Sequence, residues 1–385
     1  MSSPRRIYLH IGLPKTGTTF MQEVLWRNRT NTAAQGLLYP GRDPAAHHRA
    51  AVDLLPDRYQ GWIEPHTAGA WHWLCEQTSV WSGDVVISSE LLAIASPAQA
   101  AEALTALTFA EVHIVCTARD LVRQIPSVWQ EDVKNKRTTG FTEFVGQVRD
   151  GRQAESAEIF WSYQDLPQVL RTWGAGLPPE RVHVVTVPPR GSATDLLWQR
   201  CTSVLGIDPT GFDMTETSRN SSLDLVQTEL LRRLNTELGD SIAWPEYIRV
   251  VKGELADEIL PALSRRTAIV LPSDAREWAT EVAERFAAGI GSAGYDVVGD
   301  LADLIPAATG SAPGPQETTD SEIADIAVRA IAELMRRHTR PAEELVVGGV
   351  RRRLVDLSEQ HRQLMAMRRA YWRTRARLHN ATRRR

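Results

Sequence analysis

The segment from residue 7 to residue 29 constrains the fold of this chain more than any other. Ile7–Ile11 is an apolar run that predicts a short buried strand, and the apolar spacing of Thr18–Arg29 predicts a helix. The turn between them, within HIGLPKTGTTF (His10–Phe20), contains two glycines and three threonines. A strand, a glycine turn and a helix start in this order present backbone N–H groups and the positive end of a helix to an anion. The segment therefore predicts an anion-binding turn at the edge of a sheet.

Three further apolar runs have the character of buried strands. They are Val85–Ile87, Val112–Thr117 and Val182–Val187, and a helical pattern at Leu91–Leu107 separates the first two. Strands that are apolar throughout and alternate with helices are typical of a parallel sheet covered on both faces. The predicted fold class is therefore α/β, with a three-layer arrangement in which helices flank a parallel sheet.

Composition and the later part of the chain set the domain organisation. A chain of 385 residues with 43% hydrophobic residues can bury the core of one large α/β domain plus an appendage. Residues 305–319, rich in Ala, Gly, Pro and Thr, indicate a linker. We expect a main domain over residues 1–300, a linker over 301–320 and a helical extension over 321–385. The helices expected after Pro189 cover Thr194–Leu205, Ser222–Leu238, Trp244–Leu263, Ser273–Ile290, Ser321–His338 and Val350–Leu378.

The net charge of −3 is distributed unevenly. Residues 321–385 contain 16 arginines and 7 acidic residues, a net charge of +9, so the first 320 residues carry −12. This balance excludes a globally basic nucleic-acid binder, and we expect no nucleic-acid partner. We expect the basic extension to form an amphipathic helix that docks on its own acidic domain, on a partner or on an anionic surface. Its apolar stripe consists of Leu357, Leu364, Tyr371 and Leu378.

The cysteines and the hydropathy pattern bear on the compartment. Cys75, Cys116 and Cys201 are far apart and match no metal-ligand spacing. Such a sparse, odd set is typical of a reducing compartment, and Cys116 lies in a predicted strand as a small core residue. The N-terminal apolar run is too short for a signal peptide, and no run approaches the ~18 residues of a membrane span. We therefore expect a cytoplasmic protein with no transmembrane segment.

The position of the lysine in the glycine turn separates this loop from that of an ATPase. A Walker A loop has the pattern G-x-x-x-x-G-K-[ST]. Gly12 and Gly17 have that separation, but Thr18 occupies the lysine position and Lys15 precedes Gly17. Only four of the 44 basic residues are lysines, so Lys15 stands out, and a compact ammonium fits a tight phosphate turn where a guanidinium would clash. The loop therefore indicates a donor whose transferred group needs less charge neutralisation than a γ-phosphate.

At these residues the sequence resembles the PAPS-dependent sulfotransferases, which use 3′-phosphoadenosine 5′-phosphosulfate (PAPS) as sulfuryl donor. Their 5′-phosphosulfate loop reads roughly P-K-[ST]-G-T-T-x, and Pro14–Phe20 matches it, with phenylalanine where the family often has tryptophan. The resemblance implies a P-loop-like fold and sulfuryl transfer without a metal ion. It implies that Lys15 contacts the bridging oxygen and the sulfuryl group. It also implies that the 5′-phosphate is held by Thr16, Gly17, Thr18, Thr19 and Phe20.

A second motif follows the third predicted strand, in Ala118–Ser127 (ARDLVRQIPS). Arg119 is at the carboxyl end of that strand, where ligands bind in open α/β sheets, and Asp120 is suited to cap the next helix. In the family that the sequence resembles, an arginine at this strand end and a serine eight positions later hold the 3′-phosphate. Arg119 and Ser127 reproduce that spacing, and a guanidinium suits a phosphate because it can donate two parallel hydrogen bonds.

Sulfuryl transfer to a hydroxyl needs a base, and Glu90 is the first candidate. It directly follows the second predicted strand, at the same sheet edge as Lys15 and Arg119. Related carbohydrate sulfotransferases place a glutamate soon after this strand, whereas other members of the broader family use histidine. The sequence leaves open whether Glu90 or a histidine is the base. The histidine candidates are His10, at the end of the first strand, and His47 and His48, which we place in an irregular insertion at Asp43–Arg49.

Two other functions stay open at this point. One is a P-loop-type kinase that uses ATP, and the other is a non-catalytic nucleotide-binding scaffold whose basic extension recruits a partner. The acceptor is open as well, because acceptor-binding residues come from variable loops that carry no transferable motif. A hydroxyl or amine of a carbohydrate, a lipid or a small molecule is compatible with the sequence. No role is assigned to Lys252, which lies in a helical pattern, and the oligomeric state is not fixed.

Overall fold

The computed structural model describes residues 4–56, 64–151, 154–215, 222–263, 268–306 and 318–339. The chain divides into two units, residues 1–326 and 327–385, and the sheet and the candidate site lie in the first. The helix expected at Val350–Leu378 and most of the linker expected at 301–320 lie outside the described residues. In the part of the chain that is described, no helix is both long enough and apolar enough to cross a membrane.

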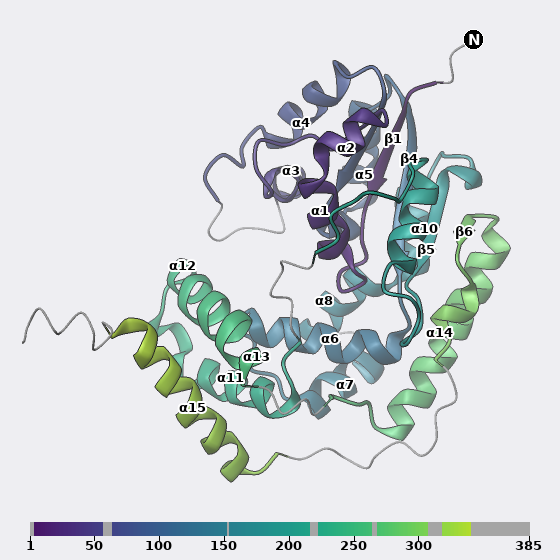
Figure 1. The fold of residues 1–385 in the computed structure, drawn as a ribbon. Helices are drawn as coiled ribbons and strands as arrows, with labels where there is room; N and C mark the ends of the chain where they lie inside the picture. The colour runs from purple at the N-terminus through teal and green to yellow at the C-terminus, as the bar shows by residue number, and fades with distance from the viewer. Residues whose placement is uncertain are drawn as a thin grey trace, which may run out of the picture. The chain divides into compact units, whose positions relative to one another are not determined.

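A six-stranded sheet, all of whose strands run parallel, lies at the centre of the first unit (Figure 1). The strand order is β2-β3-β1-β4-β5-β6. The four strands predicted from the apolar runs are the four inner ones, so the predicted α/β class is confirmed. The strands are β1 (Arg6–His10), β2 (Leu37–Leu38), β3 (Asp84–Ser88), β4 (Glu111–Ala118), β5 (Val182–Thr186) and β6 (Asp296–Val298).

Side chains along the strands alternate between two apolar cores, one on each face of the sheet. Ile7 and Leu9 of β1 point into the first core and Tyr8 into the second. Helices α3, α4, α5 and α9 cover the first, and α1 and α10 cover the second, in front of the sheet in Figure 1. The three layers are thus confirmed, and Cys116 lies fully buried in the first core. The bounds are α1 (Thr18–Arg27), α2 (Arg29–Ala34), α3 (Ala46–Leu54), α4 (Ala70–Ser79), α5 (Pro97–Ala106), α9 (Leu166–Trp173) and α10 (Leu196–Leu205).

A group of helices around α6 (Leu121–Lys134) lies beyond the carboxyl edge of the sheet (Figure 1). Helix α6 follows β4 directly and contacts α7, α11, α14 and the π-helical segment η5. Asp120 caps α6 as predicted, because its Oδ1 accepts a hydrogen bond from the Arg123 N–H at 2.9 Å. The remaining bounds are α7 (Phe141–Asp150), α8 (Glu155–Gln164), α11 (Leu225–Leu238), α12 (Trp244–Glu246), η5 (Tyr247–Ile259), α13 (Leu260–Ala262), α14 (Ser273–Ala293), α15 (Asp320–His338), and the 3₁₀ turns η2 (Glu90–Ile94), η3 (Pro179–Arg181), η4 (Gly239–Ser241) and η6 (Leu301–Leu304).

The helix predicted at Leu91–Leu107 is interrupted in the structure. The 3₁₀ turn η2 ends at Ile94, and α5 begins at Pro97. Ser96 causes the break, because its side chain accepts from the Gln99 N–H at 3.3 Å while the Gln99 side chain accepts from the Ser96 N–H at 3.0 Å. This reciprocal pair is a capping box, with proline at the first helical position, and it starts a new helix.

Candidate active site at the carboxyl edge of the sheet

The turn between β1 and α1 has a conformation suited to binding an anion. Gly12 and Gly17 have φ angles of 98° and 90°, and Lys15 is also in the left-handed region, with a φ of 66°. The φ of 90° at Gly17 strains any residue with a side chain, and a Cβ atom there would also lie 2.6 Å from Leu197 Cδ2, so the position favours glycine. Among the described residues, no side chain caps the N-terminus of α1. The backbone N–H groups of its first turn are therefore available to an anion.

Hydrogen bonds fasten this loop to β4. The Leu13 N–H donates to Thr117 O at 2.8 Å, and the Thr117 N–H donates to Gly12 O at 2.6 Å. Thr16 is buried, and its hydroxyl donates to Leu13 O at 2.5 Å and lies 2.6 Å from the Thr117 hydroxyl. The Thr16 side chain therefore holds the shape of the loop, and its backbone N–H is the group it can offer to a ligand.

The ammonium of Lys15 lies against α6 in a cluster of ion pairs. Lys15 Nζ is 3.2 Å from Glu131 Oε2, and Lys252 Nζ of η5 is 2.8 Å from Glu131 Oε1. Lys252 also donates to Asn135 Oδ1 at 2.6 Å. Burial alone would raise the pKa of Glu131, but the charges of Lys15 and Lys252 and the hydrogen bond from Lys252 outweigh it and lower that pKa to about 2. Two lysines thus share one carboxylate beside the loop.

Glu90 follows β3 and packs against the same loop. A Cβ atom on Gly12 would lie 3.0 Å from both Cα and Cβ of Glu90, so the two residues are in close contact. Gln22 of α1 donates to Glu90 Oε2 at 2.9 Å and to Ser88 Oγ at 3.2 Å. The other carboxylate oxygen of Glu90 has no hydrogen-bond partner within the described ranges, so it can accept a proton from a ligand.

His10 is buried at the end of β1, between β3 and β4. Its Nδ1 is 2.7 Å from Ser88 Oγ and its Nε2 is 3.3 Å from Thr117 Oγ1, and burial lowers its pKa to about 3. The single hydroxyl proton of Thr16 goes to Leu13 O, so Thr117 donates to Thr16 and His10 Nε2 donates to Thr117. Ser88 then donates to His10 Nδ1. His10 is therefore a neutral, satisfied core histidine.

The other two candidate histidines lie at the start of α3, so the prediction of an irregular insertion at Asp43–Arg49 is wrong from Ala46 onwards. The helix forms because its apolar side packs into the first core. His47 is buried, its Nδ1 accepts from the Ser88 N–H at 2.9 Å, and its Nε2 donates to Pro40 O. Burial lowers the pKa of His47 to about 4. His47 is thus a structural group, whereas His48 is exposed.

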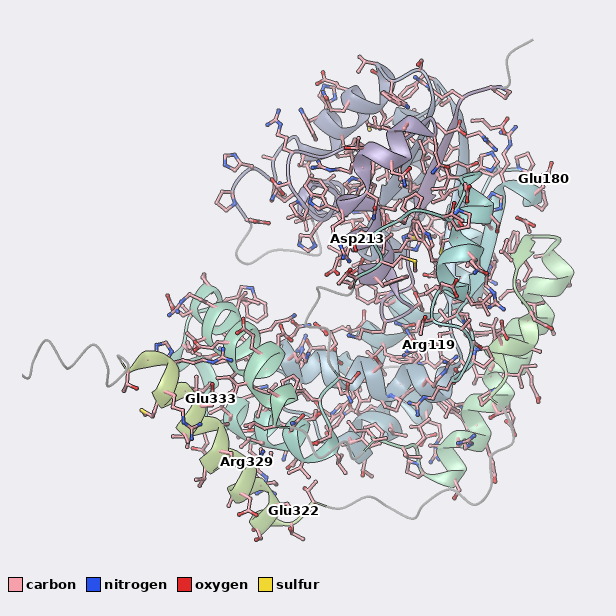
Figure 2. The ribbon with its side chains drawn as sticks, in the orientation of Figure 1. Arg119, Glu180, Asp213, Glu322, Arg329 and Glu333 are labelled. Atoms are coloured by element: carbon pink, nitrogen blue, oxygen red, sulfur yellow. The ribbon has the colours of Figure 1, made fainter. Side chains whose placement is uncertain are left out.

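Arg119 extends from the end of β4 along the start of α6 (Figure 2). Its Nε donates to Gln124 Oε1 at 2.9 Å and its Nη2 to Arg123 O at 3.0 Å. Burial, together with the charges of Arg123 and Arg190, lowers the pKa of Arg119 to about 10. Ser127 lies one helical turn after Arg123. Among the residues that the structure describes, Arg119 forms no ion pair with a carboxylate, and the Ser127 hydroxyl has no hydrogen-bond partner.

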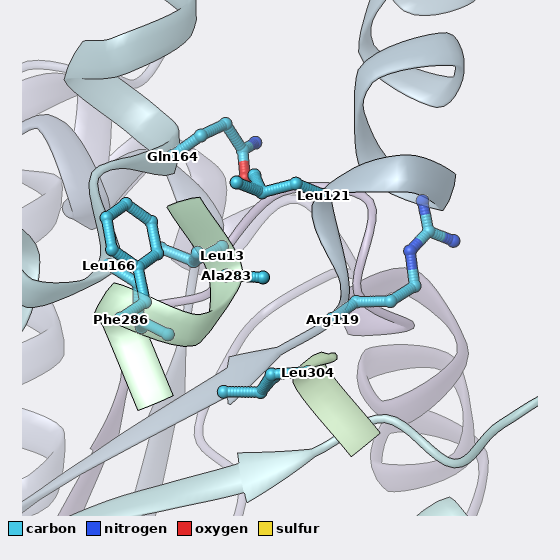
Figure 3. A pocket seen from close by; sticks show the side chains of 8 residues that line it. All are labelled: Leu13, Arg119, Leu121, Gln164, Leu166, Ala283, Phe286 and Leu304. Atoms are coloured by element: carbon cyan, nitrogen blue, oxygen red, sulfur yellow. The ribbon is translucent and has the colours of Figure 1, made fainter. Parts of the chain in front are cut away.

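A small cavity lies beside Arg119 (Figure 3). The space inside it is about 10 Å³, which is room for one water molecule and not for a nucleoside. In Figure 3 the Arg119 guanidinium points away from Leu166 and Phe286, so the charged group is not directed at these apolar side chains of the cavity. The cavity is lined by Leu13, Arg119, Leu121, Gln164, Leu166, Ala283, Phe286 and Leu304.

The sequence did not predict that the polar side chains of Gln22, Glu131 and Lys252 would lie at this site. Lys252 carried a signal, because it is one of only four lysines in a chain that otherwise uses arginine. Gln22 and Glu131 carried none, since they stand at ordinary helical positions. Their direction toward the loop depends on how α1 and α6 pack, which a single sequence does not specify.

The predicted site residues come from three neighbouring strands. The loop with Lys15 follows β1, Glu90 follows β3, and Arg119 follows β4, and β1 lies between the other two in the sheet. Anionic groups are favoured at this edge by the uncapped start of α1, by Lys15 and by Arg119. Glu90 can act as a proton acceptor. In the described ranges no three His, Cys, Asp or Glu side chains gather as they would around a metal ion. The arrangement can bind an anion on one side of the loop and accept a proton on the other.

No protein-family model matches this chain, and no curated protein matches it. A search of solved structures finds similarity to a sulfotransferase from Alicyclobacillus acidocaldarius. The two chains are 15% identical, and the match covers 64% of this chain and 99% of the other. The TM-score is 0.36, so the similarity carries no argument about activity here.

Proposed function

We propose that this chain is a sulfotransferase that takes the sulfuryl group from PAPS and transfers it to a hydroxyl or amine of an acceptor. One observation carries the proposal: a lysine-bearing, uncapped glycine loop after β1 lies between an arginine after β4 and a glutamate after β3. The loop and the arginine are the anion-binding groups that a donor with a 5′- and a 3′-phosphate requires. The glutamate is the base that an acceptor hydroxyl requires.

Each group has a distinct task in the proposed reaction. The backbone N–H groups of Thr16–Phe20, with the Thr18 and Thr19 hydroxyls, hold the 5′-phosphate at the positive end of α1. Lys15 exchanges Glu131 for the bridging oxygen of the donor and stabilises the charge that builds there. Arg119 and Ser127 hold the 3′-phosphate through donors that have no anionic partner among the described residues.

Glu90 acts as the base in this proposal. The acceptor oxygen attacks sulfur in line, its proton passes to Glu90, and the bond from sulfur to the 5′-phosphate oxygen breaks, which releases 3′,5′-ADP. Gln22 supports this role because its hydrogen bond to Oε2 orients the carboxylate, while the other oxygen has no partner among the described residues. His10 and His47 are less suited, because burial keeps both neutral rings engaged with protein groups.

Turnover with sulfur-labelled PAPS tests the proposal. The labelled donor is incubated with a hydroxyl library and with cell extract, and transfer to any acceptor is followed. We expect Lys15→Ala and Glu90→Gln to reduce turnover by roughly 10²- to 10⁴-fold, the usual loss when a charge-stabilising or proton-accepting group is removed. Glu23→Gln on α1 is the matched control and leaves turnover unchanged. Full activity of the Lys15 and Glu90 variants would rule the proposed roles out.

The same screen identifies the acceptor, and the proposal includes a carbohydrate, a lipid or a small molecule in this role.

The proposal also includes docking of the basic extension on its own domain, on a partner or on an anionic surface. The residues of that extension beyond 339 lie outside the described part of the chain.

A further inference from the structure

Gln124 occupies a buried position between the two parts of the proposed donor site. It is the fourth residue of α6 and only 1% exposed. Its amide nitrogen donates to Pro14 O at 2.5 Å and to Gln164 Oε1 at 2.9 Å, and its amide oxygen accepts from Arg119 Nε at 2.9 Å. One side chain thus links the lysine loop to the arginine at the end of β4.

The orientation of this amide is fixed by its partners. The Pro14 carbonyl can only accept a hydrogen bond, and the Arg119 guanidinium can only donate. A flipped amide would place its NH₂ group against a donor and its oxygen against a carbonyl. Both N–H donors of Gln124 are used, and Gln164 adds a second, longer bond to Pro14 O at 3.4 Å. The link is therefore stiff as well as buried.

An amide at this position orients Arg119 without neutralising it. The guanidinium has five N–H donors, of which Nε and Nη2 each use one, so three have no partner among the described residues. A carboxylate at position 124 would hold the guanidinium as well but would compete with an anionic ligand for its charge. The neutral amide leaves that charge available.

We propose that Gln124 is a positioning residue that fixes the spacing between the lysine loop and Arg119, and so makes the site selective for a nucleotide with phosphates at both the 5′ and the 3′ position. The inference rests on the proposed function. Backbone hydrogen bonds join the loop to β4 as far as Leu13 and Thr117, but they leave the direction of the Arg119 side chain open, and Gln124 fixes that direction relative to Pro14. A site preorganised for two phosphates loses little freedom when it binds both.

Calorimetric titration with 3′,5′-ADP and with 5′-AMP tests the inference, because only the first ligand has a 3′-phosphate. The quantity compared is the ratio of the two dissociation constants. Gln124→Met keeps the size of the side chain but removes the amide, and we expect the preference for 3′,5′-ADP to fall about 10-fold. Gln124→Glu is expected to reduce it at least as much, because the new carboxylate pairs with Arg119. Gln130→Met, on the same helix with one bond to Leu223 O, is the control and leaves the ratio unchanged.

A double variant separates positioning from a general effect on the fold. Arg119→Ala alone lowers the same ratio, and adding Gln124→Met to it is expected to lower the ratio no further, since Gln124 acts through Arg119. If either Gln124 variant weakens both ligands equally or leaves both unchanged, the inference is overturned while the proposed function stands. If the unaltered protein binds neither ligand, the proposed function itself fails. Should Gln124→Met not fold, Gln124→Leu, which also lacks the amide and adds no charge, gives the decisive ratio.

Discussion

At the scale of single residues, Lys15 has two competing partners. In the structure its ammonium pairs with Glu131, which also holds Lys252, and about a third of its side chain is exposed. In the proposed reaction the same ammonium contacts the donor. Binding of an anionic ligand therefore has to draw Lys15 away from a carboxylate whose low pKa of about 2 keeps it charged at every physiological pH.

Replacing that carboxylate should strengthen binding of the anionic ligand. In Glu131→Gln, Lys15 loses its counterion and the negative charge that repels the ligand disappears. We expect the affinity for 3′,5′-ADP to rise about 3- to 10-fold at low salt, and by less at high salt, where the interaction is screened. Calorimetry at two salt concentrations measures the effect. Glu143→Gln, an exposed change of equal charge on α7, is the control. Weaker binding in Glu131→Gln would mean that Glu131 supports the site and does not compete for Lys15.

At the scale of secondary-structure elements, the sequence predicts what local chemistry determines. The strands β1, β3, β4 and β5 are recognisable in the sequence because they are buried on both faces and their central residues are therefore mostly apolar. β2 has two residues and β6 has three, too few for any pattern, and they are strands only because a neighbouring strand pairs with them. The helix α3 was missed because the alanines that bury its inner side are weakly hydrophobic.

The residues of the candidate site also fall into those that the sequence predicts and those that it does not. Lys15, Glu90 and Arg119 were predictable in position, because each stands at the end of a strand and parallel strands end at one edge. Glu131, Gln22 and Gln124 were not, since each reaches the site from a helix whose rotation about its axis is set by packing. The hydroxyl of Thr16 illustrates the limit: the sequence places the residue in the loop, but the structure turns its side chain toward β4.

At the scale of the whole molecule, buried histidines couple stability to pH. The pKa of His10 is lowered to about 3 and that of His47 to about 4, both chiefly by burial, from an ordinary value of 6.5. Between these values and 6.5 the unfolded chain binds more protons than the folded one, so the free energy of unfolding falls as the pH falls. The loss begins below about pH 6.5 and amounts to about 1.4 kcal/mol per pH unit for each histidine.

A variant of His47 isolates this effect. In His47→Gln the amide can still accept from the Ser88 N–H and donate to Pro40 O, but it does not titrate. We expect the slope of unfolding free energy between pH 4.5 and 6 to decrease by about 1.4 kcal/mol per pH unit. Urea denaturation across this range gives the slope, and His72→Gln, on an exposed histidine, serves as control. An unchanged slope in His47→Gln would show that His47 is not held neutral in the folded protein.

In the proposed function, the loop after β1 and the arginine after β4 form one site for a nucleotide with both a 5′- and a 3′-phosphate. The most direct test is calorimetric titration of the unaltered protein with 3′,5′-ADP in the absence of magnesium, beside a titration with ATP and magnesium. We expect 3′,5′-ADP to bind, with an affinity that Lys15→Ala and Arg119→Ala each reduce, and we expect the ATP–magnesium complex to bind much more weakly. Tight binding of ATP with magnesium and none of 3′,5′-ADP would contradict this expectation and favour a kinase.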